Sequence, residues 1–260
     1  MRLYLAGAEG AQHELAALET PPPYLLATYY TLRNDPTTAS WLTEYVDHRG
    51  VRDLMCDSGA FTFLQGSAQT PPGGWEAYVD DYATFVREHN IEHYFELDID
   101  NVVGLERVRQ YRDRLERRVG WPPIPVWHKS RGKGAYLALC EAYDYVAVGG
   151  IAGGEITRDE ANRLVGWFTN TAHDHDAHLH FLGWSPPNRL TRTNPLPDSA
   201  DSISWRGGSR FKMTYRFTGT ELTYHQPGRK DPDRPLADAD QLNKHNLREW
   251  VKLAQHLDTP

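Results

Sequence analysis

The sequence predicts an α/β fold, a (β/α)8 TIM barrel with a C-terminal hairpin and helix. Short apolar runs alternate with longer amphipathic segments, which is the pattern of repeated β-α units. The length of 260 residues suits a barrel, whose usual size is about 250 residues. Polar and glycine-rich segments follow directly after the apolar runs, where a barrel carries its active site. This last feature favours the barrel over the alternative, a doubly wound open sheet.

Eight strands are expected where short apolar runs are bounded by turn-forming residues. In chain order they are Leu3–Ala6, Leu25–Tyr30, Arg52–Cys56, His93–Leu97, Ile124–Trp127, Tyr145–Val148, His178–Leu182 and Ser202–Trp205. Helices are expected between most neighbouring strands because the apolar residues there recur at helical spacing. They are Gly10–Leu18, Thr37–His48, Trp75–Glu88, Leu105–Arg117, Ala135–Tyr143 and Arg158–Thr171. Thr157, with Glu160 three positions later, has the spacing of a capping box for the last of these.

Beyond the eighth strand the pattern changes. Arg210–Tyr215 and Glu221–His225 flank Thr218-Gly219 and predict a hairpin, and Ala239–Leu257 predicts an amphipathic helix that packs on the barrel. The expected organisation is therefore a barrel over residues 1–205 and a hairpin plus helix over residues 206–260.

Composition excludes several classes of protein. The chain has 28 Lys and Arg against 35 Asp and Glu, a net charge of −7, which excludes a uniformly basic nucleic-acid coat. No apolar run reaches the ~20 residues that span a bilayer, and the first residues lack the apolar core of a signal peptide. We expect a cytoplasmic protein without a membrane partner.

Metal binding is not expected. Cys56 and Cys140 each lie in an apolar run and are interpreted as buried thiols rather than a disulfide. The tightest histidine group, His173, His175, His178 and His180, alternates along a loop and into a strand, which does not favour a metal site. No cofactor is predicted.

The strongest local signal is Asp57-Ser58-Gly59-Ala60-Phe61, directly after a strand. A carboxylate, small residues that let a ligand approach the backbone, and an aromatic suit a planar base or a sugar. The alternative is a helix N-cap. Because Cys56 and Phe61 are apolar, we expect the pKa of Asp57 to be raised.

Five later strands also end in polar or glycine-rich segments. These carry Asp98 and Asp100, then Trp127-His128, then Gly149-Gly150-Ile151, then Leu182-Gly183, and finally Asp201 beside the eighth strand. In a barrel all of these lie on one rim.

In this order the motifs resemble the tRNA-guanine transglycosylase superfamily, which includes queuine and archaeosine tRNA-ribosyltransferases and shorter phage and bacterial relatives that put 7-deazaguanine into DNA. The resemblance covers residues 50–206. It implies that Asp57 is the general acid/base and that Phe61 stacks on the base. It also implies that Asp98, or Asp100 two residues later, reads the guanine edge, and that Ser58, Gly59, Gly149, Gly150, Ile151, Leu182 and Gly183 line the base site. His128 or Trp127 stands where the family has a glutamine.

The resemblance further implies a nucleophilic aspartate, for which Asp201 is the best match and Ser204 the alternative register. A carboxylate is a competent nucleophile at an anomeric carbon, whereas an unassisted serine is a poor one. The cysteine-rich zinc site of the tRNA-acting relatives does not follow Trp205. We therefore expect a compact DNA-modifying enzyme, in a bacterial or phage-infected cell, rather than a tRNA enzyme.

Two other functions remain open, a glycosyltransferase or hydrolase of free purine nucleosides and a non-catalytic purine-binding barrel. A basic track beside the site favours a polynucleotide. Between Trp184 and Arg234 there are nine basic against five acidic residues. Backbone contacts are predicted for Lys129, Arg131, Lys133, Arg206, Arg210 and Lys212. The predicted partners are thus a nucleic acid, DNA before tRNA, and a 7-deazaguanine base, and an oligomer is compatible with the sequence.

Overall fold

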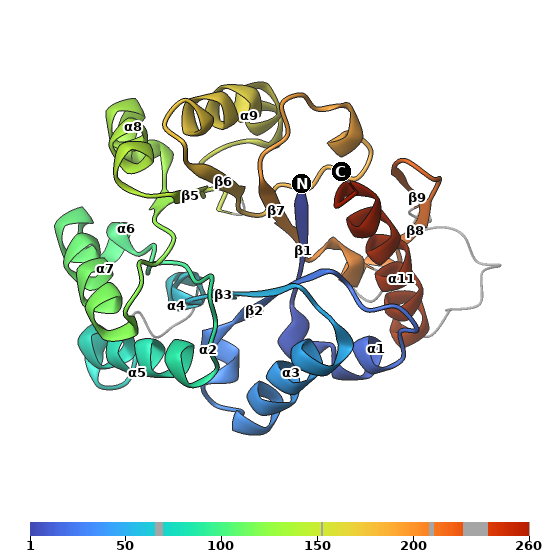
Figure 1. Ribbon diagram of the computed structural model, residues 1–260, viewed down its shortest axis with the longest axis horizontal. Coiled ribbons are helices and arrows are strands. Elements are labelled where there is room, and N and C mark those ends of the chain that lie inside the picture. Colours follow the sequence, from blue (N-terminus) through green and yellow to red (C-terminus); the bar gives the residue numbers. More distant parts are fainter. Residues whose placement is uncertain (66–69, 152, 208–210, 226–238, 260) are drawn as a thin grey trace.

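The computed structural model describes residues 1–65, 70–151, 153–207, 211–225 and 239–259. Its centre is a curled parallel sheet of seven strands in the order β3-β2-β1-β7-β6-β5-β4, with helices around it (Figure 1). The strands are β1 (Arg2–Ala6), β2 (Tyr24–Thr28), β3 (Asp53–Asp57), β4 (Val126–Trp127), β5 (Tyr145–Val148), β6 (His178–Phe181) and β7 (Ser199–Ser202). The predicted α/β class is confirmed.

One predicted strand, His93–Leu97, is reduced to two bridges. Tyr94 pairs with Cys56 of β3, and Phe95 pairs with Ile124, just before β4, both in parallel. Backbone bonds continue on both sides, because Phe95 N–H donates to Cys56 O at 3.0 Å and Glu96 N–H donates to Ile124 O at 3.0 Å. The side chain of Glu96 then turns to buried arginines, and ladder pairing ends there.

The last strand of the sheet lies earlier than predicted. Ser202–Trp205 was expected, but β7 is Ser199–Ser202, and Ser204–Arg206 forms a 3-10 turn, η4. The residues of β7 are small and buried between β1 and β6, with which they pair. Ile203, which made the predicted segment look apolar, is 56% exposed. Burial in the sheet therefore selects the small residues rather than the most hydrophobic ones.

The longer helices occur where the sequence predicts them, with shifts of a few residues at their ends. They are α1 (Gln12–Ala16), α3 (Pro36–Arg49), α5 (Gly74–Glu88), α7 (Leu105–Val119), α8 (Gly132–Ala142), α9 (Arg158–His173) and α11 (Ala239–Leu257). Thr157 caps α9 as expected, accepting a bond from Glu160 N–H. Sequence reasoning missed α2 (Tyr29–Leu32), α4 (Ala60–Gln65) and α6 (Asp100–Val103), which are too short to show a helical period. Single 3-10 turns also occur at η1 (Ala8–Gly10), η2 (Lys129–Arg131) and η3 (Leu190–Arg192).

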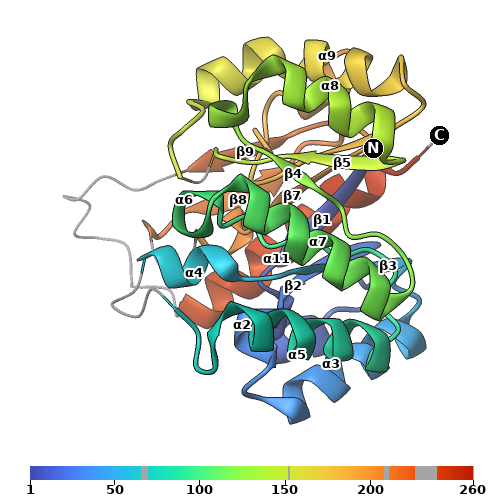
Figure 2. The ribbon, with the colours of Figure 1, turned by 90° about the vertical axis from the view of Figure 1, so that its left-hand side faces the viewer.

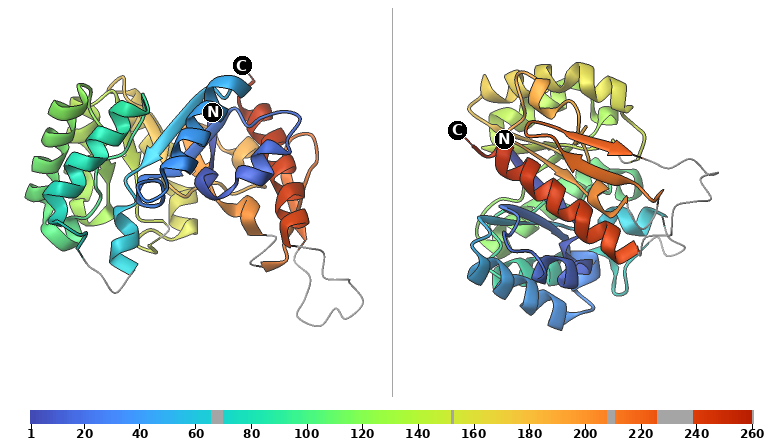
Figure 3. Two further views of the ribbon diagram at one scale, coloured as in Figure 1. Left: turned by 90° about the horizontal axis from the view of Figure 1, so that it is seen from below. Right: turned by 90° about the vertical axis from the view of Figure 1, so that its right-hand side faces the viewer.

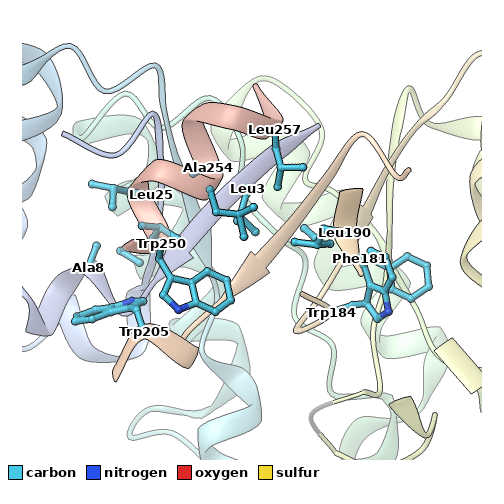
Figure 4. Packing of buried hydrophobic residues seen from close by; sticks show 14 of the residues in the cluster. Leu3, Ala8, Leu25, Phe181, Trp184, Leu190, Trp205, Trp250, Ala254 and Leu257 are labelled. Carbon is cyan, nitrogen blue, oxygen red and sulfur yellow. The ribbon is translucent and has the colours of Figure 1, made fainter. Parts of the chain in front are cut away.

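The C-terminal helix α11 packs against one side of the sheet, beside β1. Trp250 and Leu257 pack beside Leu3 of β1, and Trp205 donates its indole N–H to Ala6 O at 2.9 Å (Figure 4). The expected hairpin is β8 (Thr214–Phe217) with β9 (Leu222–His225), and its first strand lies later than the predicted Arg210–Tyr215. Asn246 of α11 accepts a bond from Tyr215 N–H at 2.9 Å, which joins helix and hairpin (Figure 3).

The parallel strands all end at one edge of the sheet, while the helices form an outer layer (Figure 2). Side chains that follow the strands therefore meet, although they are far apart in the sequence. Among the described residues, none of the helices is long and apolar enough to cross a membrane.

Candidate functional site

A cavity of about 370 Å³ lies at the carboxyl ends of the strands. Its wall contains eight of the predicted site residues, namely Asp57, Asp98, His128, Gly149, Gly150, Leu182, Gly183 and Asp201. They come from the ends of β3, β4, β5, β6 and β7 and from the segment after Phe95. The fold thus brings these eight predicted residues into one space, large enough for a purine base and its sugar.

Asp57 ends β3 and faces this cavity. Its Oδ1 accepts the N–H of Gly59 at 3.2 Å. Burial raises the pKa of Asp57 to about 7, and the nearby charges of Asp98 and Asp201 add to the effect. The predicted direction of this pKa shift is confirmed, with neighbouring carboxylates as a cause that the sequence did not reveal. A carboxyl with such a pKa exchanges a proton readily near neutral pH.

The backbone conformation and close neighbours of position 59 require glycine. Its φ is +68°, and a Cβ there would lie 2.3 Å from the Cβ of Tyr30 and 2.6 Å from Cγ2 of Thr28. Ser58 is fully buried and its hydroxyl caps Ala60 N–H at 3.3 Å, so it supports the turn and does not line the cavity. The side chain of Phe61 lies outside the described residues.

Asp201 lies inside β7, on the wall of the cavity. Its Oδ1 accepts the N–H of Gly183 at 2.7 Å, and Nε2 of His180 lies 3.3 Å from the same oxygen. Ser204, the alternative nucleophile, lines a different groove and not this cavity. The geometry therefore favours Asp201 over Ser204.

Behind Asp201 lies a buried polar chain. His180 is 0% exposed, and its Nδ1 lies 2.6 Å from Oγ of Ser199, which lies 2.6 Å from the hydroxyl of Tyr145. When Tyr145 donates to Ser199 and Ser199 donates to Nδ1, Nε2 of His180 is the ring nitrogen left to donate to Asp201. Sequence reasoning considered His180 only as a metal ligand. Its place on β6, next to Ser199 and within reach of Asp201 on β7, is a tertiary property.

Asp98, His128 and Glu155 form a second group in the cavity wall. Nε2 of His128 lies 3.4 Å from Asp98 Oδ2, and Nδ1 lies 3.1 Å from Glu155 Oε2. Burial lowers the pKa of His128, but hydrogen bonding and charge from Asp98 outweigh it and raise the pKa overall. The group presents carboxylate acceptors, with the imidazole between them, to the edge of a ligand.

Arg131 distinguishes Asp98 from Asp100, the two aspartates that follow Leu97. Its guanidinium donates to Asp100 Oδ2 at 3.0 Å and to Glu96 Oε1 at 3.2 Å, and its side chain is only 3% exposed. Against the opposing effect of burial, Arg131 lowers the pKa of Asp100. Asp100 is thus held in an internal ion pair, while Asp98 lines the cavity. The predicted backbone contact by Arg131 is wrong, because this side chain is buried and already paired.

Of the other predicted basic contacts within the described residues, Lys129 and Lys133 are exposed, and Arg206 and Lys212 are partly exposed. Lys129 pairs with Glu160 at 2.8 Å, Lys133 lies over the ring of Trp167, and Arg206 lies over the ring of Trp205. Lys212 is partly exposed at φ +56°. Arg210 lies outside the described residues.

The glycine segment after β5 approaches the cavity through its backbone. A Cβ on Gly149 would lie 2.8 Å from Cγ1 of Val126 and 3.0 Å from Cε1 of His128, so any other residue would displace Val126 and press on His128. Gly150 has φ +87° and also lines the cavity. Ile151 lies instead in a neighbouring groove, which corrects its predicted place in the base site.

Several cavity residues were missed by sequence reasoning, namely Ala6, Gly7, Glu9, Leu26, Thr28, Asn101, Gly153, Glu155 and Ile203. Burial raises the pKa of Glu9, a residue that follows β1. Only their position could have identified these residues from the sequence. Gly7, Glu9 and Thr28 follow or end the first two strands, just as the predicted site residues follow the later strands. The described residues contain no group of three or more His, Cys, Asp or Glu arranged to hold a metal ion.

No protein-family model matches the chain, and no curated protein matches it.

Proposed function

We propose that the protein is a transglycosylase that exchanges guanine in a polynucleotide, DNA before tRNA, for a 7-deazaguanine base through a covalent glycosyl-aspartate intermediate. The observation that carries the proposal is that Asp57 and Asp201 share one cavity while they are held in different ways. Asp57 has a pKa near 7, whereas Asp201 accepts hydrogen bonds from Gly183 and His180. A double displacement needs one carboxylate that trades a proton and one that attacks.

In the first step Asp201 attacks C1′ of the nucleotide, a C1′–O bond forms, and the C1′–N9 bond to guanine breaks. Asp57 gives its proton to the departing base. In the second step the incoming base loses its N9 proton to Asp57, and N9 attacks C1′ and releases Asp201. Atoms and charge balance over the two steps, and Asp57 ends protonated as it began.

The opposite wall of the cavity supports guanine-like bases. Asp98 offers carboxylate oxygens to N–H donors of the kind found at N1 and the 2-amino group of guanine, and the backbone at Gly149 and Gly150 offers further contacts at the base edge. Leu182 supplies an apolar surface for one face of the ring. Guanine and 7-deazaguanine share these features, so the same site accepts both.

We also infer that the curled sheet closes as an eight-stranded barrel. The inference is supported by the single-residue bridges of Tyr94 to β3 and of Phe95 to Ile124, which span the gap between β3 and β4. Such a barrel, in a compact chain of the phage or bacterial DNA-modifying type, belongs in the cytoplasm.

The test is incorporation of radiolabelled guanine into duplex DNA, single-stranded DNA or tRNA. Label should enter a polymer with the wild-type protein and should not enter it with Asp201→Ala. A protein–polynucleotide adduct that survives denaturing electrophoresis should form with Asp201 present. Label entering no polymer, but exchanging into free guanosine, would shift the assignment to a nucleoside enzyme.

A further inference from the structure

A second groove adjoins the cavity. It has a volume of about 360 Å³ and lies between the start of α9, the segment after β6 and the hairpin β8-β9. Gly183 lines both spaces, so the groove begins where the cavity ends. We name it the side groove and define it by Ile151, Arg158, Trp184, Arg189, Tyr215 and Tyr224.

Charge differs sharply between the two spaces. The cavity wall carries Glu9, Asp57, Asp98, Glu155 and Asp201, a set that repels phosphate groups. A bound nucleotide that places its base in this cavity must therefore keep its phosphates outside it.

The side groove carries positive charge, opposite in sign to that of the cavity wall. Arg158 and Arg189 line it, and both are exposed. Within the described part of the chain neither forms an ion pair with a carboxylate, although Asp159 also borders the groove. By contrast, Lys129 and Arg192 nearby are held by Glu160 and Glu221. The two arginines are thus available for phosphate oxygens.

An aromatic surface lies beside these arginines. Tyr224 is 53% exposed, and its ring lies 6.0 Å from that of Tyr215, which is only 3% exposed. The buried Trp184 forms a fixed wall, because its indole N–H donates to Asn162 Oδ1 at 3.0 Å and its ring packs on Phe181 (Figure 4). An exposed tyrosine on a rigid base is a platform on which a base can stack.

We propose that the side groove binds the nucleotide next to the reacting one in a single-stranded polynucleotide, with Arg158 and Arg189 on its phosphate and Tyr224 against its base. The inference rests on the proposed function, and it names the part of the substrate that lies outside the cavity. Contacts between the side-groove arginines and the neighbouring phosphate explain how a protein with an acidic cavity can accept a polyanionic substrate.

The experiment measures binding of the full chain to a fluorescein-labelled single-stranded DNA of about 12 nucleotides with one guanine, and to the RNA of the same sequence, by anisotropy. The double variant R158Q/R189Q should raise Kd about tenfold and reduce its dependence on salt. Tyr224→Ala should raise Kd about fivefold or more, and Tyr224→Phe should bind like the wild type, because the ring is kept.

The matched control is R109Q/R117Q, which removes the same charge from exposed positions of α7, on the other side of the sheet (Figure 1). This control should change Kd less than twofold, and circular dichroism melting should show all variants folded. Wild-type affinity in R158Q/R189Q would overturn the side groove alone. Failure of the wild type to bind either oligonucleotide would overturn the side groove as a single-strand site, and the transglycosylase would then be decided by label incorporation into duplex DNA and tRNA. If the oligonucleotide binds through the side groove but no guanine is exchanged, the side-groove proposal would stand and the proposed transglycosylase function would be rejected.

Discussion

Replacing Asp57 by asparagine should stabilise the folded protein in alkaline solution while it abolishes base exchange. Burial and the charges of Asp98 and Asp201 raise the pKa of Asp57 to about 7, above the unfolded value of 3.8. The folded protein therefore holds a proton that the unfolded chain has already lost. Stability from this group is highest below the unfolded pKa, falls as the pH rises toward 7, and stays reduced above it.

The size of the effect follows from the shift. About three pKa units at 1.36 kcal/mol each give an upper bound of about 4 kcal/mol. Asp57 borders an open cavity and not the packed core, which screens part of this, so we expect about 2 kcal/mol at alkaline pH. For a chain of this size that corresponds to roughly 4–8 °C in Tm. Asparagine preserves the Oδ1 acceptor for Gly59 N–H and removes the charge.

Thermal unfolding of the wild type and D57N, each at about pH 5 and about pH 8, tests the reasoning. The gain in Tm should be large at the higher pH and small at the lower one. The control is Asp80→Asn, because Arg114 and Arg118 lower the pKa of Asp80 and the variant should lose stability at about pH 8. An equal Tm difference between D57N and the wild type at both pH values would refute a raised pKa at Asp57.

Three further outcomes are expected. His180→Phe removes the Nε2 donor to Asp201 and should slow formation of the covalent adduct about tenfold or more in single-turnover kinetics. The Kd for the oligonucleotide should not change. His180→Gln keeps a hydrogen-bond donor and should recover much of the rate of adduct formation. Arg131→Met leaves Asp100 without its arginine partner and leaves Glu96 paired with Arg112 alone. The variant should lower the free energy of unfolding in urea by about 3–5 kcal/mol, and an unchanged midpoint would contradict the ion-pair role. Gly149→Ala places a Cβ against Val126 and His128 and should weaken guanine binding in equilibrium dialysis by about tenfold. Gly120→Ala meets nothing within 4 Å but is strained by its positive φ, so it should leave guanine binding intact and cost only stability.

The order of elements was accessible from sequence because each long helix and most strands carry their own periodic pattern. α11 (Ala239–Leu257) has the predicted bounds, and so does β5 (Tyr145–Val148). The elements that differ are short or centrally buried. Ser199–Ser202 has little hydrophobic signal, yet two neighbouring strands pair with it on both sides. Such a strand is specified by its neighbours and not by its own residues.

The candidate site, like the fold, could be predicted from the sequence only in part. Position after a strand was enough to predict Asp57, Asp98 and His128, because parallel strands bring their carboxyl ends together. Asp201 was chosen by the family resemblance, and it lies inside β7. Sequence could not separate Asp98 from Asp100, since the decision rests on Arg131, which reaches Asp100 from a different turn of the chain. It also gave Arg131 a surface role that its burial excludes.

By itself, then, the sequence determined an α/β chain whose strands end in carboxylates and glycines, since those patterns are local. Only the tertiary structure decided which carboxylates share a cavity, which are neutralised by arginine, and that His180 lies behind Asp201. The physical reason is that charge, burial and hydrogen bonding act over a few ångströms in space, and the folded sheet, not the order of residues, sets those distances.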